Sequence, residues 1–235
     1  PFAGDARAAL VGVVERFTAR GLRPVCATEM EFTLFDGESD PPEPPRDPVT
    51  GRRLRHADIT GLDALDRFAA FFDDLYDGAE AMGLPAQAAI SEAGTAQFEV
   101  DLSHADALRA ADDAWLFKML VKGTARRHGM AASFMAKPDP EDAGNGMHVH
   151  CSVLDSTGAN VFDDGGPEGT PALRHAVMGC LSGMADCTLI FAPHAGSYSR
   201  LVPGAHAPTG IGWAYDNRTA AIRVPDPQDR GQPEI

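Results

Sequence analysis

The sequence predicts an α+β fold, in which long helices pack against strands that form hairpins. Between the helices stand short segments with strand character that often follow one another directly, as 86–94 and 97–103 do. A doubly wound fold would instead alternate each strand with a helix. Apolar residues also recur at helical spacing over four stretches, which are 5–20, 61–82, 105–127 and 171–187.

The first third of the chain predicts helix, strand, loop and helix in that order. Helices 5–20 and 61–82 each carry one apolar face and are each followed by a glycine, which favours a helix end. Segment 25–36, VCATEMEFTLFD, alternates acids with apolar residues and is typical of a strand. Segment 37–51 is rich in proline, which forbids regular pairing, so we expect a surface loop there.

The rest of the chain continues this mixed pattern. After the expected hairpin strands comes the long helix 105–127, which a glycine again follows. Helix 171–187 carries Leu173, Val177, Leu181 and Met184 at helical spacing. Three further strands are predicted, together with a short hairpin partner at 157–164; the strands are 130–138, 148–155 and 220–225.

Composition excludes several classes of protein. The formal net charge of −14 argues against a nucleic-acid partner. No apolar run approaches the roughly 20 residues that span a bilayer, and no signal peptide opens the chain, so we expect no membrane partner. The cysteines form no CxxC pair and no secreted framework; they are Cys26, Cys151, Cys180 and Cys187. We therefore expect reduced thiols in a cytoplasmic protein.

Paired acids are the first candidate functional feature. Glu29 and Glu31 are two residues apart in a predicted strand, so both side chains point to the same face. Taken alone, such a pair is better explained by a solvated surface. Glu92 and Glu99 lie on either side of a turn of small residues in the segment SEAGTAQFEV. Such a turn allows their two carboxylates to point to one place.

Two histidines extend this set. His148 and His150 follow the glycine-rich stretch GNG and share one face of the predicted strand MHVHCS. Carboxylates with one or two histidines suit Mg²⁺ or Mn²⁺, whereas zinc prefers more histidine or cysteine. The alternative is a set of scattered surface polar residues.

Arginines form a second candidate group. Arg200, Arg218 and Arg223 lie in a segment otherwise poor in charge, and arginine suits planar contacts with carboxylate or phosphate. Each arginine has an alternative role as the partner of a surface acid. No P-loop, GxSxG, HExxH or GxGxxG motif is present.

Six motifs in order identify a resemblance. The chain reads TEMEF, SEAGTAQFEV, SFMAKP, GNGMHVHCS, SRLVPGAHAP and NRTAAIRVP, which together resemble the glutamine synthetase superfamily. Within that superfamily, the residues of these motifs are more similar to the branch that joins glutamate to amines, such as the γ-glutamylputrescine synthetases. The resemblance implies a catalytic domain over residues 1–235, with a curved antiparallel sheet forming a half-barrel and helices packed outside it.

The resemblance also implies roles for single residues. Glu31, Glu92 and Glu99 would hold one divalent ion, and Glu29 and His148 a second. His150 would lie near the nucleotide phosphates and Ser152 near the adenosine. Gly144 would line the glutamate site, Arg200 would grip a glutamate carboxylate, and Arg218 and Arg223 would face the phosphates.

The implied enzyme uses Mg²⁺ or Mn²⁺ and ATP to phosphorylate the glutamate γ-carboxylate, after which an amine displaces phosphate. Members that use ammonia carry a glutamate where this chain has His206, which makes a primary amine such as putrescine the expected acceptor. His206 is a candidate base toward that amine, or a loop histidine without a role. Relatives form rings, so we expect a homo-oligomer.

The family pattern contains two further parts that the sequence does not match. A small N-terminal β-grasp domain would precede residue 1, and a further metal-binding glutamate would fall beyond Ile235. Three alternatives stay open: an ammonia-using glutamine synthetase, an inactive structural or regulatory relative, and a metal-dependent hydrolase that also begins its site with H-x-H. Zinc preference would favour the hydrolase, and absence of magnesium-dependent ATP binding would favour the inactive relative.

Overall fold

A computed structural model describes residues 2, 4–205 and 207–225 of the chain. These residues form two compact units, each of which is described by itself. The first unit combines the chain up to Ala27 with His104–Ala111 and the part from Val149 onward. The second unit combines Thr28–Ser103 with Asp112–His148. No helix in the described ranges is both long and apolar enough to cross a bilayer.

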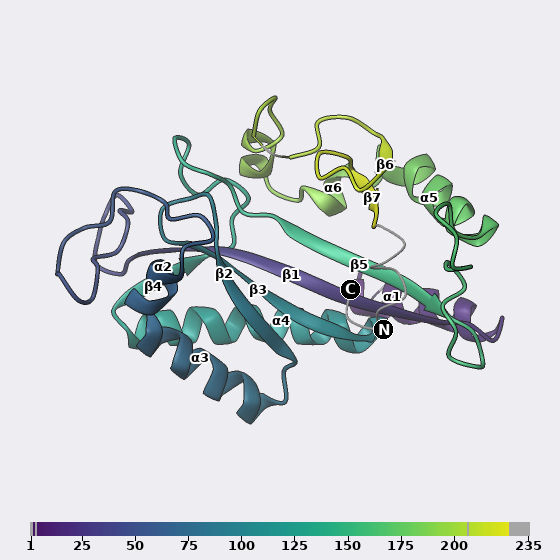
Figure 1. The fold of residues 1–235 in the computed structure, drawn as a ribbon, viewed down its shortest axis with the longest axis horizontal. Helices are drawn as coiled ribbons and strands as arrows, with labels where there is room; N and C mark the ends of the chain where they lie inside the picture. Colours follow the sequence, from purple (N-terminus) through teal and green to yellow (C-terminus); the bar gives the residue numbers. More distant parts are fainter. Residues whose placement is uncertain (1, 3, 206, 226–235) are drawn as a thin grey trace. The chain divides into compact units, whose positions relative to one another are not determined.

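The main sheet has five strands in the order β2-β3-β1-β4, and β5 also pairs with β1 (Figure 1). Strand β1 is paired antiparallel with β4, and β2 with β3, so the expected α+β class is confirmed. The sheet stays open and does not close into a barrel. The strands are β1 (Arg23–Asp36), β2 (Ala86–Ser91), β3 (Gln97–Asp106), β4 (Met130–Ser133) and β5 (Met147–Leu154).

An aromatic core lies in the second unit, between the sheet and helices α3 (Ala69–Met82) and α4 (Ala107–Arg127). Strand β1 contributes Phe32, which is fully buried and lies 6.3 Å from Phe71 of α3, measured between ring centroids. Because side chains alternate along a strand, residues 30, 32 and 34 face this core and residues 29, 31 and 33 face the other way. The acids of β1 therefore lie on the face of the sheet opposite the aromatic core.

The helix expected over 61–82 is in fact two helices, α2 (Leu62–Arg67) and α3, which meet at Phe68. Phe68 leaves helical geometry, with φ −104° and ψ 21°. Its ring is buried and lies 5.6 Å from Phe98 of β3, in an edge-on contact. Tertiary packing of this one ring therefore overrides the continuous helical periodicity. The end of α3 is as expected, because Gly83 adopts a positive φ of 65°.

The first unit contains the remaining helices and a small sheet. Helix α1 (Ala6–Thr18) is capped at its N-terminus by Asp5, whose carboxylate accepts a hydrogen bond from the backbone N–H of Arg7. Its expected apolar face is only half-buried, since no residue of α1 is fully buried. The other elements are α5 (Pro171–Met184), α6 (Thr188–Phe191), a 3₁₀ turn (Ala195–Ser199), β6 (Trp213–Tyr215) and β7 (Ile222–Val224).

Two expectations in the first unit hold, with differences in detail. The expected hairpin partner at 157–164 forms one antiparallel bridge, between Leu154 and Asn160, and Val161 donates its backbone N–H to the carbonyl oxygen of Val153 at 2.8 Å, but the segment is not a full strand. The expected strand at 220–225 is present as β7, but it pairs in parallel with β6, which the sequence did not indicate. Val224 of β7 packs with Leu173 and Val177 of α5 into a small second core.

Candidate metal centre

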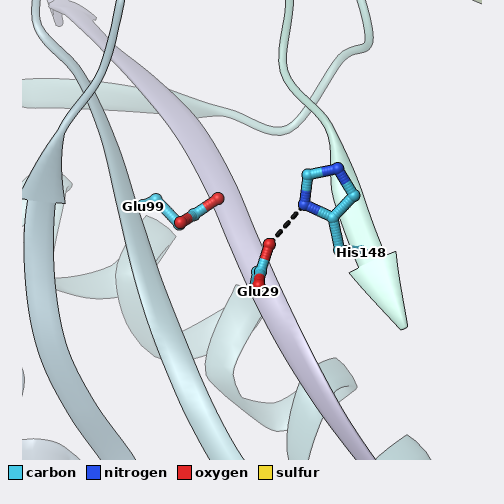
Figure 2. A group of neighbouring side chains, drawn as sticks. All are labelled: Glu29, Glu99 and His148. Carbon is cyan, nitrogen blue, oxygen red and sulfur yellow. Dashed lines mark hydrogen bonds and ion pairs between the residues drawn. The ribbon is translucent and has the colours of Figure 1, made fainter. Parts of the chain in front are cut away.

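Three side chains from three adjacent strands converge on one face of the main sheet. They are Glu29 of β1, Glu99 of β3 and His148 of β5. One potential ligand atom from each lies within 4.8 Å of the other two. Figure 2 shows the carboxylates of Glu29 and Glu99 and the imidazole of His148 directed toward a common point.

The strand pairing explains this convergence. Glu29 is one of the β1 residues that face away from the aromatic core, because its neighbour Met30 is buried in that core. On β3 the same alternation places Phe98 and Val100 in the core and Glu99 on the other face. His148 comes from β5, which pairs with β1. Side chains on adjacent strands that share a face are close neighbours, so the three groups meet.

Glu99 carries the strongest electrostatic signal in the cluster. Its side chain is buried at 8% exposure, and the pKa of its carboxyl is raised from 4.5 to about 8. Burial is the largest cause, and the negative charges of Glu29, Glu31, Asp101 and Glu92 contribute the rest, in that order of effect. The carboxyl is thus protonated at neutral pH unless a positive charge lies beside it.

His148 lies beside these carboxylates and is paired with one of them. Its Nδ1 is hydrogen-bonded to Oε2 of Glu29, and this bond raises the pKa of the imidazole, which burial opposes. The carboxylates of Glu29, Glu31 and Glu99 raise it further. The side chain of His148 is 62% exposed, so one side of the cluster is open to solvent.

This donor set fits a hard divalent cation. The group consists of two carboxylates and one imidazole, and their crowding suppresses the ionisation of Glu99. A bound cation would stabilise the group, because it would favour the ionised carboxylates. Carboxylate-rich sites suit Mg²⁺ or Mn²⁺, and among the described residues no cysteine and no second histidine joins the group.

Glu31 is held by the glycine-rich loop beside this group. Its Oε2 accepts a hydrogen bond from the backbone N–H of Gly146 at 2.8 Å and another from Nε2 of Gln97 at 3.1 Å. Gln97 also donates to the carbonyl oxygen of Gly144 at 2.9 Å. One acid of the expected metal set is therefore tied to the loop that precedes His148.

Asn145 anchors the same loop from within the protein. It is buried, and its Oδ1 accepts hydrogen bonds from Thr33 Oγ1 and Gln97 Nε2, each at 3.0 Å. Its Nδ2 donates to the carbonyl oxygens of Ser133 at 3.2 Å and Met135 at 2.9 Å. The loop therefore has a fixed path despite its glycines.

The acids of the two ion sites that the resemblance implied lie near one another. Glu99 converges with Glu29 and His148, and the charges of Glu31 and Glu92 also raise the pKa of its carboxyl. Glu92 is half-buried in the turn between β2 and β3, where its backbone N–H donates to the carbonyl oxygen of Gln97 at 2.9 Å. Gln97 and Asn145 were not identified from the sequence.

The other predicted residues lie in the first unit or outside the described residues. His150 and Ser152 are half-buried on β5, two residues apart and so on one face of it. Arg223 is half-buried on β7, and Arg218 is exposed in the preceding turn. Arg200 has a buried Nε with no hydrogen-bond partner among the described residues. His206 lies outside the described residues.

Comparison with known proteins identifies the family. The family model of the glutamine synthetase catalytic domain matches residues 3–234. The chain belongs to this family, as the six sequence motifs predicted.

Individual relatives agree with this assignment. The chain is 38% identical to γ-glutamylputrescine synthetase PuuA of Escherichia coli (strain K12), over 96% of this chain and 48% of the relative. It is 36% identical to a glutamine synthetase of Thermus thermophilus, over 96% of this chain and 50% of that protein. The chain thus spans about half the length of the curated relatives it matches.

A solved structure supports the fold. The structure described as apo GmaS without ligand superimposes with a TM-score of 0.83 at 30% identity, over 95% of this chain and 51% of that one.

Proposed function

We propose that the chain is the catalytic part of an ATP-dependent ligase that joins the γ-carboxylate of glutamate to a primary amine. The observation that carries this proposal is the convergence of Glu29, Glu99 and His148 in a chain of the glutamine synthetase family. The choice of an amine rests on the 38% identity to a γ-glutamylputrescine synthetase. Putrescine or a similar small diamine is therefore the proposed acceptor.

Glu29, Glu99 and His148 would hold a Mg²⁺ or Mn²⁺ ion, with Glu31 and Glu92 as further acids on the same unit. When bound, such ions neutralise charge on the phosphates of ATP and on the reacting carboxylate. The protein's own contribution is a fixed array of ligands. Glu31 keeps its orientation through Gly146 and Gln97, so its carboxylate is positioned before any ligand binds.

The arginines supply binding and charge stabilisation in this proposal. The buried Nε–H of Arg200, which has no partner among the described residues, would donate to a carboxylate of glutamate. Arg218 and Arg223 would contact phosphate oxygens and stabilise the charge that develops during transfer. His150 and Ser152 would contact the nucleotide, and the backbone at Gly144 would line the glutamate site.

The reaction has two steps. An oxygen of the glutamate γ-carboxylate attacks the terminal phosphorus of ATP, and the bond from that phosphorus to the bridging oxygen breaks to release ADP. The amine nitrogen then attacks the acyl carbon of γ-glutamyl phosphate, and the bond from that carbon to the phosphate oxygen breaks. The attacking nitrogen loses a proton, for which His206 is the proposed base.

An ammonia-using glutamine synthetase is the second candidate, because curated glutamine synthetases match the chain at similar coverage. The experiment that separates the two measures ADP release with Mg²⁺, ATP and glutamate, using the protein as its gene encodes it. Faster release with putrescine than with ammonium is expected. Preference for ammonium would replace the amine ligase with glutamine synthesis, and release with neither acceptor would contradict both.

A further inference from the structure

Two cysteine sulfurs are in direct contact in the first unit. Sγ of Cys26 on β1 and Sγ of Cys151 on β5 lie 3.3 Å apart, although 125 positions separate the residues in the sequence. Both cysteines are free thiols, and their strands are paired within the main sheet. A disulfide requires an S–S distance of about 2.0 Å, so a shift of little more than 1 Å would bring the two sulfurs to bonding distance.

The two thiols differ in chemical character. Cys151 is exposed, whereas Cys26 is half-buried. The hydrogen bond from Cys26 lowers the pKa of Cys151 to about 7, with burial opposing and His150 assisting. The same bond, together with burial, raises the pKa of Cys26 far above its ordinary value. Since the thiolate is the reactive form, Cys151 is the attacking thiol and Cys26 is the thiol that keeps its proton.

We propose that Cys26 and Cys151 form a reversible redox pair that closes to a disulfide on exposure to a peroxide. In the first step the Cys151 thiolate attacks one oxygen of hydrogen peroxide, the O–O bond breaks, the other oxygen leaves as hydroxide, and Cys151 becomes a sulfenic acid. In the second step the Cys26 sulfur attacks the Cys151 sulfur, the S–O bond breaks, and the departing hydroxyl takes the proton of Cys26 and leaves as water. The two sulfurs lose two electrons in total, and the peroxide gains them. A dithiol reduces the disulfide back to the two thiols.

The position of the pair gives the bond a consequence for the neighbouring strand. Cys151 lies between His150 and Ser152, and alternation directs those two side chains to the opposite face of β5. A disulfide would draw β5 toward β1 at this point. If His150 and Ser152 contact nucleotide as proposed above, oxidation weakens nucleotide binding; this consequence alone rests on the proposed function.

The test is disulfide mapping in the folded protein. The protein is treated with a small excess of hydrogen peroxide, its remaining thiols are alkylated with N-ethylmaleimide, and the digest is analysed by mass spectrometry. The expected result is one linked peptide pair that contains Cys26 and Cys151, with two of the four cysteines protected from alkylation. Dithiothreitol should restore all four.

Matched variants identify the pair. Cys180→Ser and Cys187→Ser should form the linked peptide at the wild-type rate. Cys26→Ser should leave a sulfenic acid on Cys151 that dimedone traps, and Cys151→Ser should abolish both products. A linkage through Cys180 or Cys187, full alkylation of all four cysteines after peroxide, or equal linkage in urea-unfolded protein would overturn the proposal. ATP binding of the oxidised protein is measured separately, so a failure of the nucleotide assignment does not affect the mapping result.

Discussion

Replacing Glu99 with glutamine is predicted to stabilise the metal-free protein while weakening its binding of divalent cations. The substitution keeps the shape of the side chain and removes its ability to carry negative charge. Folded Glu99 has a pKa of about 8, against 4.5 for the ordinary carboxyl. The folded state therefore binds a proton that the unfolded state releases, and Glu99 destabilises the fold increasingly as pH rises from about 4.5 to about 8.

The size of the effect follows from this interval. One pH unit is worth about 1.4 kcal/mol, so at pH 7 the raised pKa of Glu99 lowers the free energy of unfolding by about 3 kcal/mol. Glu99→Gln should recover most of this at pH 7 and very little at pH 4.5. The variant is expected to bind divalent cations more weakly than wild type. It has lost one of three ligands whose potential ligand atoms lie within 4.8 Å of one another.

Urea unfolding with EDTA, at pH 4.5 and at pH 7, measures the first effect, and calorimetric titration with Mn²⁺ measures the second. Glu141→Gln, at an exposed acid outside the cluster, serves as the matched control and should change neither quantity. A Glu99→Gln protein that is less stable than wild type in EDTA at pH 7 would refute the electrostatic reasoning. Unchanged Mn²⁺ affinity would refute the assignment of Glu99 as a ligand.

Three further predictions concern the same unit. His148→Ala should weaken Mn²⁺ binding at least tenfold with little change in unfolding free energy, because the side chain is 62% exposed; equal affinity in calorimetry would contradict this. Asn145→Ala should lower the unfolding free energy by about 2–4 kcal/mol, since it leaves buried partners without their hydrogen bonds; a loss below about 0.5 kcal/mol in urea unfolding would show that the loop is held otherwise. Mn²⁺ affinity should rise as pH is increased from 6 to 8, because raised pKa values keep protons on Glu99 and His148 that the ion must displace; affinity independent of pH would argue for binding elsewhere.

Much of the fold could be predicted because local pattern and packing agree. The alternation of acids and apolar residues in 25–36 is the alternation of two faces in β1, with Met30, Phe32 and Leu34 in the aromatic core and the acids on the other face. The helix also ends at Gly83, as expected. Phe68 is the clear exception, because its burial against Phe98 depends on a strand that is distant in sequence.

Residue spacing alone predicted the residue types of the candidate site, whereas their grouping as neighbours came only from the resemblance to the family. The E-x-E pattern places Glu29 and Glu31 on one face, yet nothing local shows that β3 and β5 both pair with β1 and bring Glu99 and His148 to Glu29. Asn145 stands between two glycines, a pattern typical of a turn, and Gln97 begins a predicted strand, so neither position indicates a buried hydrogen-bonding role.

The transfer of labelled oxygen tests the central claim most directly. Glutamate labelled with ¹⁸O in its γ-carboxylate is supplied with Mg²⁺, ATP and putrescine, and the released phosphate is analysed by mass spectrometry. Phosphorylation of the carboxylate predicts one ¹⁸O atom in each phosphate, because the acyl C–O bond breaks when the amine attacks. Unlabelled phosphate, with ADP still released, would mean that water and not glutamate takes the phosphoryl group, and would contradict the ligase mechanism.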